Sequence, residues 1–164
     1  MTNLRVLAPS ILLPCLLSAQ VPSEPAAGPP VVQNADEKAV LATIDALFAS
    51  FESGDSAAML RQVYPDGRVT ASGRRGDGAS NLRPQSWTMF AERITRQQAF
   101  QERIANPIVR VDDGIALVWA PFVVRVGGKL SNCGIDHFDL VRENGVWRVM
   151  NLTFSSRTTG CPAQ

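Results

Sequence analysis

The sequence has few of the residues from which most catalytic and metal sites are built. Its 164 residues include one histidine, His137, one tyrosine, Tyr64, and three cysteines. One histidine and two distant cysteines do not have the ligand spacing of a zinc site. The sequence also lacks a glycine-rich phosphate-binding motif and the motif of a Ser-His-Asp hydrolase. These absences argue against metal, nucleotide and serine-hydrolase sites, and we expect no cofactor.

The sequence also lacks an excess of charge of either sign. It has 16 Lys and Arg against 15 Asp and Glu, and loss of residues 1–20 would leave 15 of each. A balanced chain has no electrostatic footprint for nucleic acid or for an anionic membrane. Because 45% of the residues are hydrophobic and 19% charged, the composition is that of a soluble globular protein, and the length suits one domain.

Residues 1–20 have the layout of a secretory signal peptide. Arg5 is followed by an apolar run that is broken only by Pro9, Ser10 and Pro14. This run is too short and too proline-broken for a transmembrane helix, so we expect export to the periplasm or medium with cleavage, and no membrane contact afterwards. A retained anchor is the alternative, and a lipid anchor at Cys15 fits poorly. Residues 21–33 contain four prolines and predict an extended linker before a domain at 34–164.

Cleavage leaves two cysteines, Cys133 and Cys161. In an oxidising compartment an even pair predicts a disulfide. Closing a loop of this size contributes roughly 3–4 kcal/mol in the chain-entropy model. Two independent reduced thiols are the alternative.

The first half of the domain is predicted to be helical. Asn34 and Glu37 form a capping-box pattern, and Gly54 ends the helix that they begin. Its apolar positions recur at helical spacing at Val40, Leu41, Ile44, Leu47, Phe48 and Phe51. Asp55 is expected to cap a second, short helix that buries Met59, Leu60 and Val63.

Turn and loop signals separate this region from a third helix. Residues 64–67, Tyr-Pro-Asp-Gly, predict a turn, 68–72 a short strand, and 73–84 a glycine-rich loop. Ser86 is expected to cap the third helix, which directs Trp87, Met89, Phe90 and Ile94 inward. Arg74, Arg75 and Arg83 of the loop could cover an anionic ligand, although a solvated loop is the simpler interpretation.

From Phe100 onward the hydrophobic pattern alternates with the period of a strand. Four strand-like runs, 100–111, 115–126, 129–143 and 146–157, are separated by Asp112-Asp113-Gly114, Gly127-Gly128 and Asn144-Gly145. These separators favour hairpins, and Pro107 and Pro121 should mark bulges or edges because neither can donate to a ladder. The order predicts an α+β fold, with three helices packed on a curved antiparallel sheet.

This arrangement resembles the NTF2-like superfamily, which includes SnoaL-like and ketosteroid-isomerase-like domains. The resemblance covers residues 34–156, and its most specific motif is Gly-Val-Trp-Arg-Val at 145–149. It implies a cone with a pocket between the helices and the concave sheet, and a homodimer through the outer sheet face. It implies function weakly, because the fold hosts enzymes and non-enzymatic modules alike. Tyr64 lies at a turn and not on the first helix, so the isomerase triad does not carry over.

His137 and Asp139 are the strongest candidates for acid/base chemistry. If both flanking hairpins have two-residue loops, His137 opposes Leu152 and Val118, and Asp139 opposes Met150 and Ala116. The pair would then share a face with Ile135, Ala120, Phe122 and Phe154. Asp136 would oppose Thr153 on the other face, which also carries Phe138, Leu140, Trp119, Leu117, Trp147 and Val149. A bulge at Pro121 would exchange the faces. The alternative is a satisfied pair that orders the sheet or a subunit interface.

We therefore expect an exported NTF2-like domain that binds a small, mostly apolar molecule in the cone. Trp87, Trp119 and Tyr64 are candidate ligand contacts, although buried aromatic residues usually belong to the core. One alternative is a cofactor-free lyase or isomerase of the dehydratase type that uses His137 and Asp139. Another is an assembly module with a filled cone. A strict monomer in light scattering would contradict the homodimer.

Overall fold

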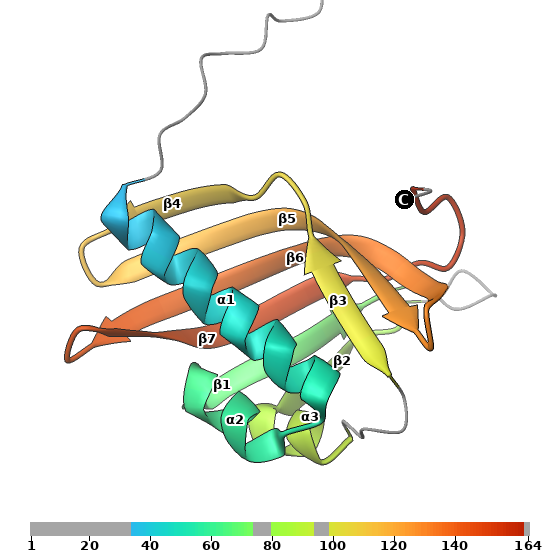
Figure 1. Ribbon diagram of the computed structural model, residues 1–164, viewed down its shortest axis with the longest axis horizontal. Coiled ribbons are helices and arrows are strands. Elements are labelled where there is room, and N and C mark those ends of the chain that lie inside the picture. The colour runs from blue at the N-terminus through green and yellow to red at the C-terminus, as the bar shows by residue number, and fades with distance from the viewer. Residues whose placement is uncertain (1–33, 74–79, 94–98, 163–164) are drawn as a thin grey trace, which may run out of the picture. The chain divides into compact units, whose positions relative to one another are not determined.

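The computed structural model describes residues 34–73, 80–93 and 99–162. These residues form three helices on one face of a seven-stranded sheet, the predicted α+β fold (Figure 1). The predicted signal peptide with Cys15, the linker at 21–33, Arg74, Arg75 and Ile94 lie outside the described residues. No helix of the described ranges is both long and apolar enough to cross a membrane.

The first helix, α1 (Ala35–Ser53), has the caps that its sequence predicts. Asn34 Oδ1 accepts a hydrogen bond from the Glu37 N–H at 2.8 Å, and the Glu37 carboxylate accepts one from the Asn34 N–H at 3.1 Å. Gly54 ends the helix with a left-handed φ of 65°. The predicted apolar stripe is buried except for Leu41, which is half-buried. This stripe packs α1 across the sheet (Figure 1).

The two shorter helices, α2 (Ser56–Gln62) and α3 (Trp87–Arg93), begin at the predicted caps. Asp55 accepts from the Ala58 N–H, and the Ser86 hydroxyl accepts from the Met89 N–H. The prediction that Leu60 and Met89 point inward is wrong, because both side chains are exposed. Each helix is only about two turns long, so it buries a narrow face that the helical pattern alone cannot locate.

The strands are β1 (Val63–Ser72), β2 (Arg83–Ser86), β3 (Phe100–Ile104), β4 (Ile108–Asp112), β5 (Ile115–Val126), β6 (Lys129–Glu143) and β7 (Val146–Ser155). Their order is β2-β1-β7-β6-β5-β3, and β4 also pairs with β5. The pairs are antiparallel except for β1 with β7, which is parallel, so the sheet is mixed. The chain from β1 to β7 passes through all other strands, which allows the parallel pairing that hairpin signals do not predict.

The predicted turn at residues 64–67 lies inside β1. The pairing with β7 is irregular between Val63 and Arg68, so these four residues form a distortion of the strand and not a connection. A Cβ atom on Gly67 would lie 1.7 Å from the backbone oxygen of Met150. Glycine is therefore required for the close approach of β1 to β7.

The prolines of the strands act as predicted for Pro107 and differently for Pro121. Pro107 lies in the break that divides the predicted run 100–111 into β3 and β4. Pro121 lies within β5 and pairs with Ile135 without a bulge. The Pro121 carbonyl accepts a hydrogen bond from the Ala105 N–H at 3.0 Å. The Pro121 nitrogen, which carries no hydrogen, therefore faces the break between β3 and β4. No ladder hydrogen bond is lost there.

Two bulges elsewhere change the predicted register. Between β5 and β6, Arg125 pairs with Leu130 but Val124 pairs with Asn132, so Ser131 is the extra residue. Between β6 and β7, Leu140 pairs with Val149 but Asp139 pairs with Asn151, so Met150 is the extra residue. Each bulge moves the pairing by one residue, and a slip of one residue exchanges the faces of a strand.

The core lies between α1 and the inner face of the sheet. The rings of Phe48 and Phe138 meet edge to face with centroids 5.9 Å apart, and Phe48 and Phe51 pack similarly at 5.8 Å. Val118, Ala120 and the other inward residues of β5 complete this layer. Apolar packing fills the cone along most of α1, and a cavity lies at the end near β3 and α3.

The structure contains the predicted disulfide between Cys133 and Cys161. Their Cα atoms are 5.6 Å apart across a sequence separation of 28. Cys133 also exchanges two backbone hydrogen bonds of 3.0 Å with Arg157. The disulfide and this bridge hold the C-terminal segment against β6.

Candidate ligand-binding site

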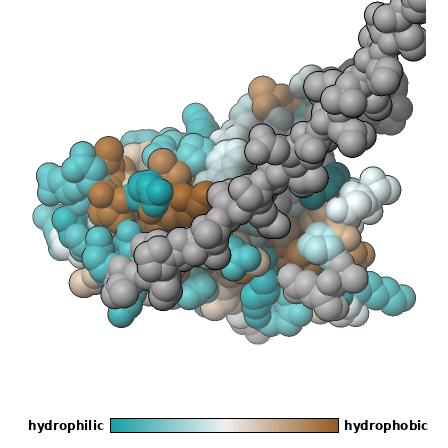
Figure 2. Space-filling view, turned by 90° about the horizontal axis from the view of Figure 1, so that it is seen from above, coloured by the Kyte–Doolittle hydropathy of each residue, from teal (hydrophilic) through white to brown (hydrophobic). Residues whose placement is uncertain are grey.

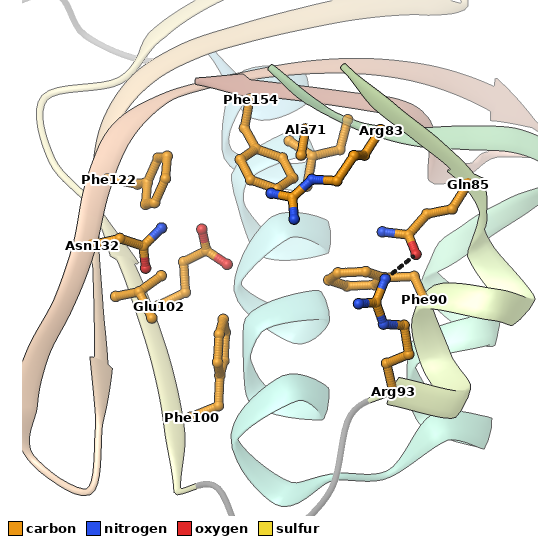
Figure 3. A pocket seen from close by; sticks show the side chains of 12 residues that line it. Ala71, Arg83, Gln85, Phe90, Arg93, Phe100, Glu102, Phe122, Asn132 and Phe154 are labelled. Atoms are coloured by element: carbon orange, nitrogen blue, oxygen red, sulfur yellow. Dashed lines mark hydrogen bonds between the residues drawn. The ribbon is translucent and has the colours of Figure 1, made fainter. Parts of the chain in front are cut away.

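A cavity of about 310 Å³ lies between α3, β3 and the inner face of the sheet (Figure 3). Its volume is at the lower end of the range of small-molecule sites. Seven apolar and five polar residues line it: Ala71, Phe90, Phe100, Phe122, Val124, Leu152, Phe154, Arg83, Gln85, Arg93, Glu102 and Asn132. They come from β1, β2, α3, β3, β5, β6 and β7, so only the complete fold assembles the site.

Aromatic rings form most of the apolar wall. Phe122 and Phe154 from neighbouring parts of the sheet pack edge to face at 6.1 Å. The buried ring of Phe51 on α1 supports both Phe90, at 5.4 Å, and Phe100, at 6.0 Å, on the opposite side. Each ring is therefore held by a second ring. Such walls suit a flat aromatic or apolar molecule.

Strand β3 is fixed beside the cavity by Glu52 at the end of α1. The Glu52 carboxylate accepts hydrogen bonds from Arg103 Nη2 at 2.8 Å and from Gln101 Nε2 at 2.6 Å. The hydrogen bonds from Arg103 and Gln101 lower the pKa of Glu52. Because Gln101 and Arg103 are directed toward α1, the residue between them, Glu102, projects to the other face of the strand.

Glu102 places a buried carboxyl group in the cavity. Its exposed fraction is 6%, and Figure 3 shows the carboxyl pointing into the space between the rings. Behind it, Asp136 on β6 has an exposed fraction of 0%. Neither oxygen of Asp136 accepts a hydrogen bond from an N–H or hydroxyl donor within the described ranges. The Glu102 carboxyl interacts with Asp136, and two neighbouring carboxyls can form a hydrogen bond only when one of them carries a proton.

Burial changes the protonation of both acids. Loss of hydration raises the pKa of Glu102 to about 8, although the hydrogen bond with Asp136 partly opposes this rise. Burial, followed by the charge of Glu102 and the hydrogen bond to it, raises the pKa of Asp136 well above its ordinary value. Asp136 is therefore the hydrogen-bond donor and Glu102 the acceptor. At neutral pH the Glu102 carboxyl is therefore mostly protonated.

The exposed polar residues mark the side on which the cavity opens to solvent. Arg83 on β2 and Arg93 on α3 are exposed, and Arg93 Nη1 donates to Gln85 Oε1 at 3.1 Å (Figure 3). Asn132, beside Glu102, donates through its side-chain nitrogen to the Ser156 hydroxyl at 2.9 Å. The cavity thus has two cationic groups at its opening and an acid pair at its inner end.

Comparison with known proteins places this fold and cavity in a family. The sequence profile of the family described as “Putative lumazine-binding” matches residues 35–155. The chain belongs to this family. No curated protein has a significantly similar sequence.

Solved structures show which fold this member of the family shares. Similar structures include a protein of unknown function with a cystatin-like fold from Nostoc punctiforme, an NTF2-like protein from Cytophaga hutchinsonii, and the beta subunit of a “putative aromatic-ring-hydroxylating dioxygenase” from Novosphingobium aromaticivorans. Each has a TM-score of 0.61, with identities of 11%, 12% and 14%. They cover 76%, 76% and 77% of this chain and 92%, 100% and 92% of their own. At these identities the likeness establishes the fold alone, and the domain is NTF2-like as the resemblance implied.

The three aromatic residues expected to contact a ligand are dispersed in this NTF2-like domain. Trp87 is buried in the core, where its Nε1 donates to the Met150 carbonyl at 3.0 Å. Trp119 lies on the outer face of β5 and has an exposed fraction of 48%. Tyr64 is half-buried at the start of β1. None of the three lines the described cavity, and their roles as ligand contacts stay predictions.

His137 and Asp139 share a face, as expected, but it is the outer face of the sheet. Because of the two bulges, His137 pairs with Trp119 and Thr153, and not with Val118 and Leu152. Its ring centroid is 6.0 Å from that of Trp119. The predicted neighbours Val118, Ala120 and Phe122 lie on the inner face.

Asp139 has a structural partner on the same face. It pairs with Leu117 and Asn151, and not with Ala116 and Met150. Its carboxylate accepts a hydrogen bond of 2.9 Å from Asn151 Nδ2, and the Asn151 side-chain oxygen accepts from the Arg68 N–H at 3.0 Å. These bonds join β6, β7 and β1, so Asp139 helps to order the sheet. Acid/base catalysis by His137 and Asp139 stays a prediction.

The outer face is more apolar than a solvated sheet face. His137 and Asp139 line a shallow hollow together with Ile115, Leu117 and other residues of β4 and β5. Figure 2 looks down on the β4 side of the sheet and shows apolar surface between polar side chains; Ile108, Ile115 and Leu117 are among the exposed apolar residues of these strands. Dimerisation through this face stays a prediction of the family resemblance.

Neither buried acid, Glu102 or Asp136, is among the site residues predicted from the sequence. Asp136 was expected to face Thr153, but it pairs with Phe154 and Ala120 on the inner face. Each strand carries a signal for this burial. Glu102 lies two residues from Phe100 and from Ile104, and so on their face of the strand; Asp136 likewise shares a face with Phe138 and Leu140. An acid in the apolar phase of a strand predicts a buried carboxyl. The described residues contain no group of three or more His, Cys, Asp or Glu side chains placed to hold a metal ion.

Proposed function

We propose that the protein binds a small aromatic molecule in the cavity between α3, β3 and the inner sheet face. The observation that carries this proposal is the ring-lined cavity with the Glu102 carboxyl directed into it. The name of the family supports the same class of ligand, because lumazine is a flat bicyclic aromatic molecule. Burial of an aromatic ligand between the rings would supply most of the affinity.

The two ends of the cavity would orient the ligand. Arg83 and Arg93 at the opening favour an anionic or strongly polar group there. At the inner end, the polar residues of the described lining are Glu102 and Asn132. An aromatic molecule with one polar edge directed inward and another polar group near solvent fits these constraints.

Binding of aromatic probes tests the proposal. Calorimetry with lumazine and with 2-quinolone should give saturable binding to the wild-type protein. Phe100→Ala should weaken binding about tenfold, because it removes one ring of the wall. Trp119→Ala is the matched control, since it removes an aromatic residue from the outer face and should leave the affinity unchanged. No binding of any aromatic probe, or sensitivity to Trp119 and not Phe100, would refute the proposed site.

We also propose that the mature protein is exported. The layout of residues 1–20 and the disulfide between Cys133 and Cys161 support export, because disulfides persist in oxidising compartments. Mass spectrometry of the secreted or periplasmic protein should show one cross-link that disappears on reduction. Cys161→Ser should lower the free energy of unfolding by roughly 3 kcal/mol relative to the oxidised wild type. Two free thiols in protein recovered from an intact cytoplasmic fraction would contradict the proposal.

A further inference from the structure

The hydrogen-bond donors and acceptors of the acid pair at the inner end of the cavity define what it can bind. Asp136 is fully buried, and the Glu102 carboxyl is the group that its proton can reach. A protonated Asp136 donates to one oxygen of Glu102. That leaves Glu102, when it also carries a proton, with one O–H donor and a neighbouring carbonyl acceptor directed into the cavity (Figure 3).

We propose that protonated Glu102 recognises a lactam or imide edge, a ring N–H next to a ring C=O, on the aromatic ligand. This inference rests on the proposed binding of an aromatic molecule in the same cavity. The Glu102 O–H would donate to the ligand carbonyl, and the ligand N–H would donate to the Glu102 carbonyl. The two bonds are parallel and lie in one plane, so they would select a flat edge of this pattern over a lone acceptor.

The alternative is an ionised Glu102 that binds a cationic ligand. Arg83 on β2 and Arg93 on α3 line the cavity, and the buried Asp136 on β6 interacts with Glu102. The two arginines favour the ionised form of Glu102, but both are exposed at the opening, where solvent screens them. Burial acts in the opposite direction and dominates, since the pKa of Glu102 is raised to about 8. At neutral pH the protonated form prevails, and the cavity favours a neutral partner.

The walls next to the acid pair are consistent with a neutral edge. Phe122 and Phe154 flank the acids, and Asn132 is a neutral amide whose nitrogen is already bonded to Ser156. A cationic ligand group at this depth would lose its hydration with only one carboxylate as compensation. A lactam or imide loses less hydration and recovers two hydrogen bonds.

Matched probes separate this inference from the proposed function. The probes are 2-quinolone, whose lactam N–H stays protonated between pH 6 and 9.5, N-methyl-2-quinolone, which lacks the N–H, and naphthalene, which lacks both groups. Dissociation constants are measured by calorimetry or NMR at both pH values. The proteins are wild type, Glu102→Gln, which offers an N–H and a C=O at every pH, and Glu102→Leu, which offers neither.

For the wild type at pH 6, 2-quinolone should bind about tenfold more tightly than N-methyl-2-quinolone. Its affinity should fall by up to about tenfold by pH 9.5, because ionised Glu102 has no O–H to donate to the ligand carbonyl and only the ring contacts remain unchanged. Naphthalene should show no such change. Glu102→Gln should keep the preference for the lactam and lose the pH dependence, and Glu102→Leu should bind both quinolones alike.

The outcomes that overturn the inference differ from those that overturn the proposed function. If all three probes bind equally and without pH dependence, the aromatic site stands and recognition by Glu102 is wrong. If the affinity for 2-quinolone rises with pH, the ionised form binds and the inference is also wrong. If no probe binds, the proposed function fails as well. Should Glu102→Leu not fold, the wild-type pH dependence and its loss in Glu102→Gln decide the question.

Discussion

Replacing Gly67 by alanine is expected to destabilise the domain by at least about 3 kcal/mol, enough to lower its melting temperature by roughly 10 °C or more. The added Cβ would lie 1.7 Å from the Met150 backbone oxygen and 2.9 Å from Trp87 Nε1. Both neighbours are fixed, because Trp87 Nε1 donates to that same oxygen at 3.0 Å. Relief therefore requires β1 to move away from β7, which opens the parallel pairing and the core beneath it.

Gly114→Ala is the matched control for this prediction. A Cβ on Gly114 would have its nearest neighbour, the Arg142 carbonyl oxygen, at 3.8 Å, an ordinary contact distance. Thermal unfolding followed by circular dichroism should show a melting temperature close to the wild-type value for Gly114→Ala and a much lower one for Gly67→Ala. Equal melting temperatures for the two variants would show that β1 does not approach β7 as closely as described.

The largest effect of pH is expected at Glu102. A carboxyl whose pKa rises on folding binds more protons in the folded state, so its contribution to stability is complete below its unfolded pKa and is lost as the pH rises. For Glu102 the window runs from its ordinary value of 4.5 to about 8. Within it, the wild type should lose on the order of 1.4 kcal/mol of stability per pH unit through this group. Glu102→Gln removes the group and its pH dependence.

Urea denaturation at several pH values measures this difference. Near pH 4, Glu102→Gln and the wild type should have similar free energies of unfolding. Near pH 8 the variant should be more stable by several kcal/mol. Glu92→Gln, on the exposed side of α3, removes a glutamate that is not buried and should give a curve parallel to the wild type. Parallel curves for Glu102→Gln and the wild type would mean that Glu102 is not buried in its protonated form. Asp136 remains in both proteins, and burial, the largest cause of its raised pKa, acts in both.

The acid pair also shows how far a site can be predicted from one sequence. Alternation within β3 and β6 placed Glu102 and Asp136 in the apolar phase of their strands, which is a local signal. That these acids meet depends on β3 pairing with the far side of β5 and on the bulge at Ser131. Neither feature has a local signal. A bulge forms where one strand has an extra residue relative to its partner, and this depends on both strands and not on a single residue. His137 and Asp139 were predicted as an acid/base pair from their residue types, but the bulges at Ser131 and Met150 place them on the outer face.

Elements with local causes follow directly from the amino-acid sequence. The capping box at Asn34, the left-handed Gly54, the hairpin turn at Asn144-Gly145 and the cysteine pair each act over a few residues or through simple chemistry, and each is present in the structure. In contrast, the faces of the sheet, the parallel pairing of β1 with β7, and the cavity arise from contacts between distant segments. These depend on how distant strands align, where a shift of one residue moves every side chain to the opposite face.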